Sequence, residues 1–192
     1  MSKQDEYMYK NAQENTAQRN EQSIESNLSH ANPPHTNDTE QPIVLSPALL
    51  ELWDGQQLED KQHLAMLLLT VGENGFPYQA MVSVGEVLAM DEQHVRIALW
   101  TGTNTTGNLQ RDGKALLSFV YQEVGWTLRL RMKELPALEN SMYPRARFEG
   151  TVEHIKQDIA PYADLLTGVT FRLHEPEQGL ERWKTTLDEL KL

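Results

Sequence analysis

The sequence predicts a mainly β (α+β) fold, in which about six antiparallel strands form a closed or partly closed barrel with short helices at its periphery. Three observations lead to this prediction. Apolar residues recur with a period of two in several segments, which is typical of strands with one buried face. Turn-forming Gly, Asn and Asp residues separate those segments. Helical patterns lie only at connections and near the end of the chain, so the alternation that a Rossmann fold needs is missing.

The first 42 residues are expected to form a disordered polar tail, and residues 43–192 a single folded domain. The tail is rich in Asn, Gln, Glu and Ser and has no periodic apolar pattern. A weak helix is tolerated over its first 30 residues. Such a helix would have no apolar face to bury, which favours a solvated tail.

The domain is expected to open with a short helix, because Ser46 suits the N-cap and Pro47 the first helical position. An Asn-Gly turn joins strands at 64–71 and 78–84, and Gly85 marks a bulge or a point of close approach. Residues 86–90 are expected to continue the second strand after Gly85. The other predicted strands are 94–100, 115–121, 126–133, 146–155 and a short one at 169–173, and the other helices are 104–111, 158–166 and 176–190.

Alternation also predicts which side chains of these strands face the core. The inner sets are Val95, Ile97 and Leu99, then Trp126, Leu128, Leu130 and Met132, and then Ala146, Phe148, Gly150 and Val152. In the last helix, Trp183 shares helical spacing with Leu180 and Leu187, which predicts packing in the core or in an interface.

The segment 100–109, Trp-Thr-Gly-Thr-Asn-Thr-Thr-Gly-Asn-Leu, carries the strongest indication of chemistry. It lies between a predicted strand and a predicted helix, where unpaired backbone N–H groups favour a phosphate. Its Thr hydroxyls add donors, and Gly102 and Gly107 allow close approach to the backbone. The same residue types are common at ordinary helix caps, so both interpretations stay open. Nearby strand residues that could border a flat, partly polar pocket are Gln79, Met81, Ser83 and Arg96.

Three runs of the sequence resemble the pyridoxamine 5'-phosphate oxidase-like family. They are 75–89, which opens with a Gly-x-Pro turn, 96–100, and 103–113, which has an Asn-Leu pair before an Asp-Gly turn. The resemblance covers roughly residues 45–175 and implies a homodimer of split β-barrels with FMN at the subunit interface. It implies that the FMN phosphate is lined by Thr103, Thr105, Thr106 and Asn108, and that the flavin ring or ribityl chain is approached by Ser83, Val84 and Gly85.

The sequence departs from the oxidase that gives the family its name. A basic Arg/Lys pair of that oxidase is replaced by Asn104-Thr105, and its Arg on the second strand is missing. Arg182-Trp183 does not reproduce its C-terminal pattern for the pyridoxal substrate. We therefore do not predict oxidation of vitamin B6.

Composition argues against several classes of function. A net charge of −11 disfavours nucleic acid and anionic membranes as partners. The chain has no Cys, which excludes disulfides and thiol catalysis and agrees with a reducing cytoplasm, where we expect the protein. Neither a signal peptide nor a membrane span is predicted. The six His are widely separated and lack the spacing of a zinc hydrolase, so no metal site is predicted.

The prediction is an FMN-binding flavoprotein that acts as an oxidoreductase on an unknown small molecule. No residue is a compelling general acid or base, which suits hydride transfer by a flavin. One alternative is a non-enzymatic split barrel that binds a ligand or serves in stress. Another is a variant that binds haem through His94, or the deazaflavin F420 through Arg129, Arg131 and Lys133. Those basic residues would otherwise be solvated or paired with Glu149 and Glu153.

Overall fold

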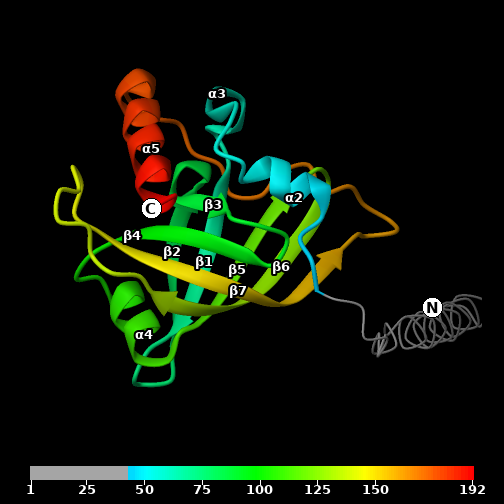
Figure 1. Ribbon diagram of the computed structural model, residues 1–192. Coiled ribbons are helices and arrows are strands. Elements are labelled where there is room, and N and C mark those ends of the chain that lie inside the picture. Colours follow the sequence, from blue (N-terminus) through cyan, green and yellow to red (C-terminus); the bar gives the residue numbers. More distant parts are fainter. Residues whose placement is uncertain (1–42) are drawn as a thin grey trace, which may run out of the picture. The chain divides into compact units, whose positions relative to one another are not determined.

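The computed structural model describes residues 43–192, and Figure 1 shows how they are arranged. Within this range no helix is long and apolar enough to cross a membrane. The polar tail predicted over residues 1–42 lies outside the described residues and stays a prediction. The strands are β1 (Ala65–Val71), β2 (Pro77–Ser83), β3 (Val87–Ala89), β4 (His94–Trp100), β5 (Lys114–Tyr121), β6 (Val124–Glu134) and β7 (Arg145–Asp158). The helices are α2 (Pro47–Leu52), α3 (Leu58–Lys61), α4 (Asn104–Asp112) and α5 (Pro176–Leu190), with a 3-10 turn, η1, at Val84–Glu86.

The seven strands form one antiparallel sheet in the order β2-β1-β5-β6-β7-β4-β3. The sheet curls strongly around its own concave face, and the helices lie at its ends and edges (Figure 1). The predicted mainly β fold is therefore confirmed as a split β-barrel, with seven strands instead of about six. The two outermost strands, β2 and β3, are consecutive in the chain and are joined by η1 alone. The prediction that residues 86–90 continue the second strand is therefore wrong, because η1 ends β2 and β3 pairs with β4 at the other edge.

The concave face holds the side chains that alternation placed inside. Ile97, Leu128 and Phe148 are completely buried there. Trp53, directly after α2, is also completely buried; its Nε1–H points at the Met66 sulfur, 3.3 Å away. The short helix α2 thus plugs one end of the barrel through an apolar face. Its start agrees with the prediction, since the Ser46 hydroxyl accepts a hydrogen bond from the Leu49 N–H and Pro47 is the first helical residue.

The turn between β5 and β6 is tighter than the sequence indicated. Gln122 and Glu123 both have positive φ, 51° and 63°, and connect Tyr121 directly to Val124. Two such residues make the kind of hairpin turn whose right-handed twist matches that of the strands. Gly or Asn usually marks such a turn in a sequence, and the turn positions 122 and 123 hold Gln and Glu. The strand predicted from residue 126 therefore begins two residues later than β6, which starts at Val124.

The segment between β7 and α5 contradicts two predictions. The helix predicted over 158–166 is wrong, because β7 continues through Asp158 and the residues after it are not helical. Pro161 disfavours helix at the preceding residue, and Ile159 and Tyr162 are exposed instead of forming a buried helix face. The strand predicted over 169–173 is reduced to a single bridge between Leu64 and Thr170. Helix α5 matches its predicted bounds.

Candidate functional site

The Thr-rich segment forms the start of α4, as the sequence predicted. Thr103 is the N-cap residue; its hydroxyl accepts from the Thr106 N–H at 3.2 Å, and the Thr106 hydroxyl accepts from the Thr103 N–H at 3.0 Å. This reciprocal pair is a capping box. It leaves the backbone N–H groups of Asn104 and Thr105 without an acceptor within residues 43–192. The helix therefore starts with two free donors at the positive end of its dipole.

Asn108 anchors α4 to the sheet. Its side-chain amide donates to the Thr70 hydroxyl on β1 at 3.0 Å, and its carbonyl oxygen accepts from Arg111 at 2.9 Å. Asn108 is 6% exposed, and Thr105 on the same helix is buried as well. Of the four residues predicted to line a phosphate, Asn108 thus has its side chain committed to holding the helix in place.

Ser83, Val84 and Gly85 lie in and beside η1, where the chain leaves β2. The Ser83 N–H and hydroxyl both donate to one carboxylate oxygen of Glu86, at 2.9 and 3.0 Å. Val84 is 1% exposed, and the backbone of Gly85 lies against the ring of Trp183 on α5. The expected close approach at Gly85 is confirmed, and the group that makes it is an indole of the same chain.

Arg145 at the start of β7 connects these two segments, and sequence reasoning missed it. Its Nη1 donates to the other carboxylate oxygen of Glu86 at 2.7 Å. Its guanidinium also stacks on the ring of Trp100, 3.9 Å from the centroid, directly before the Thr-rich loop. The Arg145 side chain is only 2% exposed and that of Glu86 17%. A chain of contacts therefore runs from Ser83 through Glu86 and Arg145 to the loop that precedes α4.

A small cavity of about 110 Å³ opens beside this loop. Two buried arginines of β7, Arg145 and Arg147, form part of its wall, and the Nε of each has no hydrogen-bond partner in the described part of the chain. Burial, together with the charge of Arg96, lowers the pKa of Arg147 from its ordinary value, and two backbone carbonyls, of Pro136 and Glu189, accept from its guanidinium. The other lining residues are Thr101, Gly102, Thr106, Gln110, Glu134, Leu135, Ala137 and Ala146.

These arginines could have been suspected from the run Arg-Ala-Arg at 145–147. Alternation assigned Ala146 to the core, and the flanking arginines were left unassigned on the opposite face. Their burial depends on other parts of the chain: Arg145 contacts Glu86 of η1 and Trp100 of β4, and Arg147 contacts the β6–β7 connection and α5. Such coverage is a tertiary feature that strand periodicity does not encode.

Of the three basic residues on β6, Arg131 has a local partner, and so does His94 on β4. Arg131 pairs with Glu153 at 2.9 Å, as one of the two interpretations expected, whereas Glu149 pairs with Arg96 on β4 instead. The His94 ring lies 2.9 Å from the Asp91 carboxylate. Among residues 43–192, no three His, Asp or Glu side chains are grouped so that they could hold a metal ion.

Comparison with known proteins gives the family of the chain. Residues 56–177 match the family model described as pyridoxamine 5'-phosphate oxidase. The uncharacterised protein YclD of Bacillus subtilis is 44% identical over 147 residues, which cover 77% of this chain and 96% of YclD. Two solved structures are more distant. HupZ of Group A Streptococcus is 16% identical, with a TM-score of 0.46 and coverage of 67% of this chain and 99% of HupZ. An FMN-binding protein of Syntrophomonas wolfei is 17% identical, with a TM-score of 0.42 and coverage of 57% and 85%. From the matched model and the similarity to YclD, the chain belongs to the pyridoxamine 5'-phosphate oxidase family.

Proposed function

We propose that this protein is an FMN-binding flavoprotein, which holds the FMN phosphate at the start of α4 and uses the flavin in an oxidoreductase reaction. One observation carries the proposal: two buried arginines line a cavity whose wall also includes Thr101 and Gly102 of the loop before that helix and Thr106 of its first turn. A phosphate carries about two negative charges, and it is bound most strongly by helix N-termini and guanidinium groups acting together.

The residues around the cavity fit a phosphate group. The N–H groups of Asn104 and Thr105 provide donors at the helix start. Arg145 adds a buried charge whose Nε–H lacks an acceptor among the described residues. It can therefore serve in place of the basic pair that the sequence lacks at Asn104-Thr105. Gly102 has a φ of 71°, and a Cβ at this position would meet no atom within 4 Å, so its backbone is open to a ligand.

The chain itself would position the cofactor. When bound, the flavin would supply the reactivity, as a carrier of hydride or electrons. Glu86 and the Trp100 ring hold the Arg145 guanidinium in place before a phosphate arrives, which lowers the entropy cost of binding. In the proposal, Thr103, Thr105 and Thr106 form the helix start that faces the phosphate. Asn108 holds α4 in place, and Ser83 holds Glu86. Val84 and Gly85 serve as packing residues.

We further propose that a second copy of the chain covers the outer face of β1, β2 and β5. Leu67, Leu69 and Leu116 are only half buried there, and Met81 is 62% exposed. Pairing between the strands places Met81 beside Leu67, and Leu69 beside Leu116, so the face is continuous. A contiguous apolar face of this kind marks an interaction surface. A homodimer would bury it and could shield a flavin ring between the two copies.

The experiment compares FMN with riboflavin, which has the same ring and no phosphate. Apoprotein of the full chain is titrated with each, and flavin fluorescence is followed. We expect FMN to bind more tightly than riboflavin. Glu86→Gln combined with Arg145→Gln should weaken FMN binding on the order of tenfold, since a hydrogen bond to a charged group contributes about 1.5–3 kcal/mol. The same variant should leave the affinity for riboflavin unchanged. The combined substitution removes both charges of the pair and so leaves no buried carboxylate unpaired.

The matched control is Arg131→Gln, which removes an exposed basic residue of β6 and should leave FMN affinity unchanged. A protein that takes up no added FMN would contradict the proposal, as would equal affinity for FMN and riboflavin. The dimer is tested separately by light scattering. A wild-type mass of one chain would contradict it, and Met81→Glu should shift a dimer toward monomer.

A further inference from the structure

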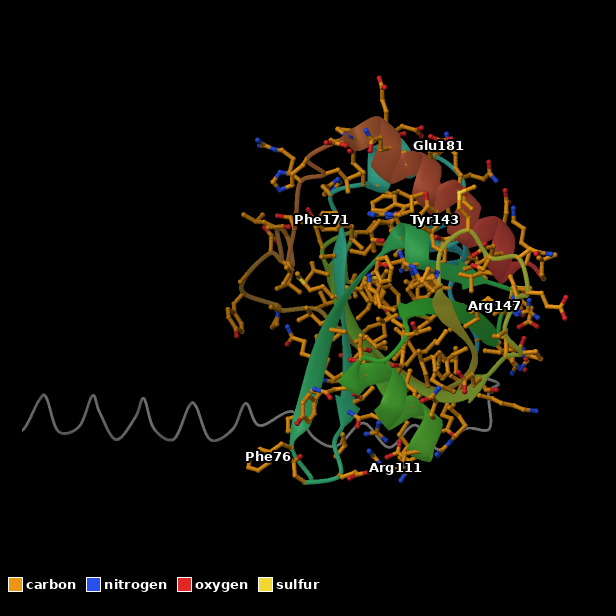
Figure 2. The ribbon with its side chains drawn as sticks, turned by 90° about the vertical axis from the view of Figure 1, so that its left-hand side faces the viewer. Phe76, Arg111, Tyr143, Arg147, Phe171 and Glu181 are labelled. Atoms are coloured by element: carbon orange, nitrogen blue, oxygen red, sulfur yellow. The ribbon has the colours of Figure 1, made fainter. Side chains whose placement is uncertain are left out.

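A second and larger cavity, of about 600 Å³, lies at the opposite end of the barrel from α4. Figure 2 shows Tyr143 and Phe171 beside α5, well away from Arg111 on α4. The cavity is lined by the segment 171–175, by the first turns of α5 and by Tyr143 from the β6–β7 connection, and it shares no lining residue with the α4 cavity. Its volume is within the range of small-molecule sites, about 300–1,000 Å³.

The charged donors of this cavity are uncommitted. Arg172 and Arg182 both line it, and neither forms an ion pair or side-chain hydrogen bond with any described residue. The Nε of Arg182 is buried and has no hydrogen-bond partner among residues 43–192. Elsewhere in the described chain, arginines that bind a carboxylate or a carbonyl are Arg96, Arg111, Arg131, Arg145 and Arg147. Arg172 is exposed and Arg182 is half buried, so both guanidinium groups are free to bind an anion that enters the cavity.

The start of α5 adds donors to the same cavity. Glu175 is the N-cap residue, and its side chain caps no N–H group. Pro176 has no N–H, so the free donors of the first turn are the N–H groups of Glu177 and Gln178, and the Gln178 side chain lines the cavity. This helix has 15 residues, long enough for a developed dipole whose positive end lies here.

The remaining wall combines the rings of Phe171 and Tyr143 with Leu173, Gly179, His174 and Glu175, and Glu175 is the one acidic residue in the lining. Phe171 is half buried and packs edge-on against Trp183, with 6.2 Å between the ring centroids, and Tyr143 is half buried opposite it. A site with convergent positive groups on one side and rings on the other suits a ligand that has an acidic group attached to a ring or a short apolar body.

We infer that this cavity binds a small organic anion, a carboxylate or phosphate monoester with an aromatic or apolar body. Arg182 and Arg172 hold the acidic group together with the N–H groups at the start of α5, and the rings of Phe171 and Tyr143 contact the body. The inference is independent of FMN binding, because the two cavities have separate walls.

The test is calorimetric titration of the full chain with phenyl phosphate, benzoate and, as a neutral probe, benzyl alcohol. We expect saturable binding of phenyl phosphate, benzoate or both, and none of benzyl alcohol. Binding of one anion only would identify the acidic group. Arg182→Gln and Arg172→Gln should each lower the affinity for the anion on the order of tenfold, and FMN uptake should be unchanged. The control is Arg129→Gln, which removes an exposed arginine of β6 outside the cavity.

Three results would overturn the inference. The first is no saturable binding of either anion up to about 10 mM, a concentration at which even a site with a Kd of 1 mM, or about −4 kcal/mol, would be largely filled. The second is a loss of anion affinity in Arg129→Gln equal to that in Arg182→Gln, which would show that the overall charge of the protein attracts the anion. The third is weaker anion binding in the combined Glu86→Gln and Arg145→Gln variant together with unchanged anion binding in Arg182→Gln. That result would place the anion in the α4 cavity instead.

Discussion

Trp183 lies so close to Gly85 that a Cβ on Gly85 would come within 1.9 Å of the indole ring. Trp183 is 3% exposed and belongs to the last helix, whereas Gly85 belongs to the turn between the two edge strands. The contact therefore fixes α5 onto η1, which also carries Glu86, the partner of Arg145. Sequence position gives no hint of this contact, since the two residues are far apart in the chain.

Gly85→Ala should destabilise the fold, because the added methyl group must displace the Trp183 ring. Overpacking of this kind costs about 1–3 kcal/mol, and we expect a loss of that size in the free energy of unfolding, measured with urea. Adding Trp183→Leu to Gly85→Ala should cost less than the sum of the two single substitutions. Additive losses would show that the indole does not press on Gly85.

Gly107→Ala should stabilise the fold, and it is the matched control for Gly85→Ala. Gly107 lies within α4, and a Cβ at this position would meet no atom within 4 Å. Alanine is favoured over glycine in a helix by about 0.5–1 kcal/mol, so the urea midpoint of the apoprotein should rise. A lower midpoint would mean that α4 packs more closely here than the structure shows.

Breaking the ion pair of Arg145 and Glu86 from one side should be costly. Arg145→Met leaves the Glu86 carboxylate, 17% exposed, without its cation, and loss of one partner of a buried pair costs on the order of 3 kcal/mol. Arg145→Met combined with Glu86→Gln should recover part of that loss. A coupling energy near zero in this double-mutant cycle would contradict the contact.

Asp91 should contribute stability that disappears in acid. The N–H of Gln93 and the His94 side chain hydrogen-bond its carboxylate, and they lower its pKa below the ordinary 3.8. A lowered pKa in the folded state means that the stabilisation is present above pH 3.8 and is lost as the pH falls through the folded pKa. Asp91→Asn should therefore be less stable than the wild type at pH 7, and the difference should shrink only as the pH falls below 3.8. A difference that stays constant down to pH 2.5, about one unit below the ordinary Asp value, would exclude this role.

Local patterns predicted β1, β2, β4, β5, β6, β7 and α5 to within a few residues, because each has a clean period and clear ends. Ser46, the Asn74-Gly75 turn and the alternation from Trp126 to Met132 all act within a few residues. The helix expected over 158–166 failed because its apolar residues, such as Tyr162, had no surface to bury against. For a related reason Arg145 was missed, and Arg182 was considered only as part of a substrate pattern that it does not reproduce. Their importance comes from neighbours that other parts of the chain bring to them, and residue spacing contains no such information.

The connection through η1 has a consequence for the shape of the whole sheet. β2 and β3 occupy the two outer positions, six inter-strand steps apart, which in a flat sheet would separate them by roughly 28 Å at about 4.7 Å a step. The four peptide links from Ser83 to Val87 can span at most about 14 Å. A planar arrangement is thus forbidden by the length of the tether, whatever the twist of the strands. Curvature here is a covalent constraint, and a single backbone cleavage within Val84–Glu86 would be enough to remove it.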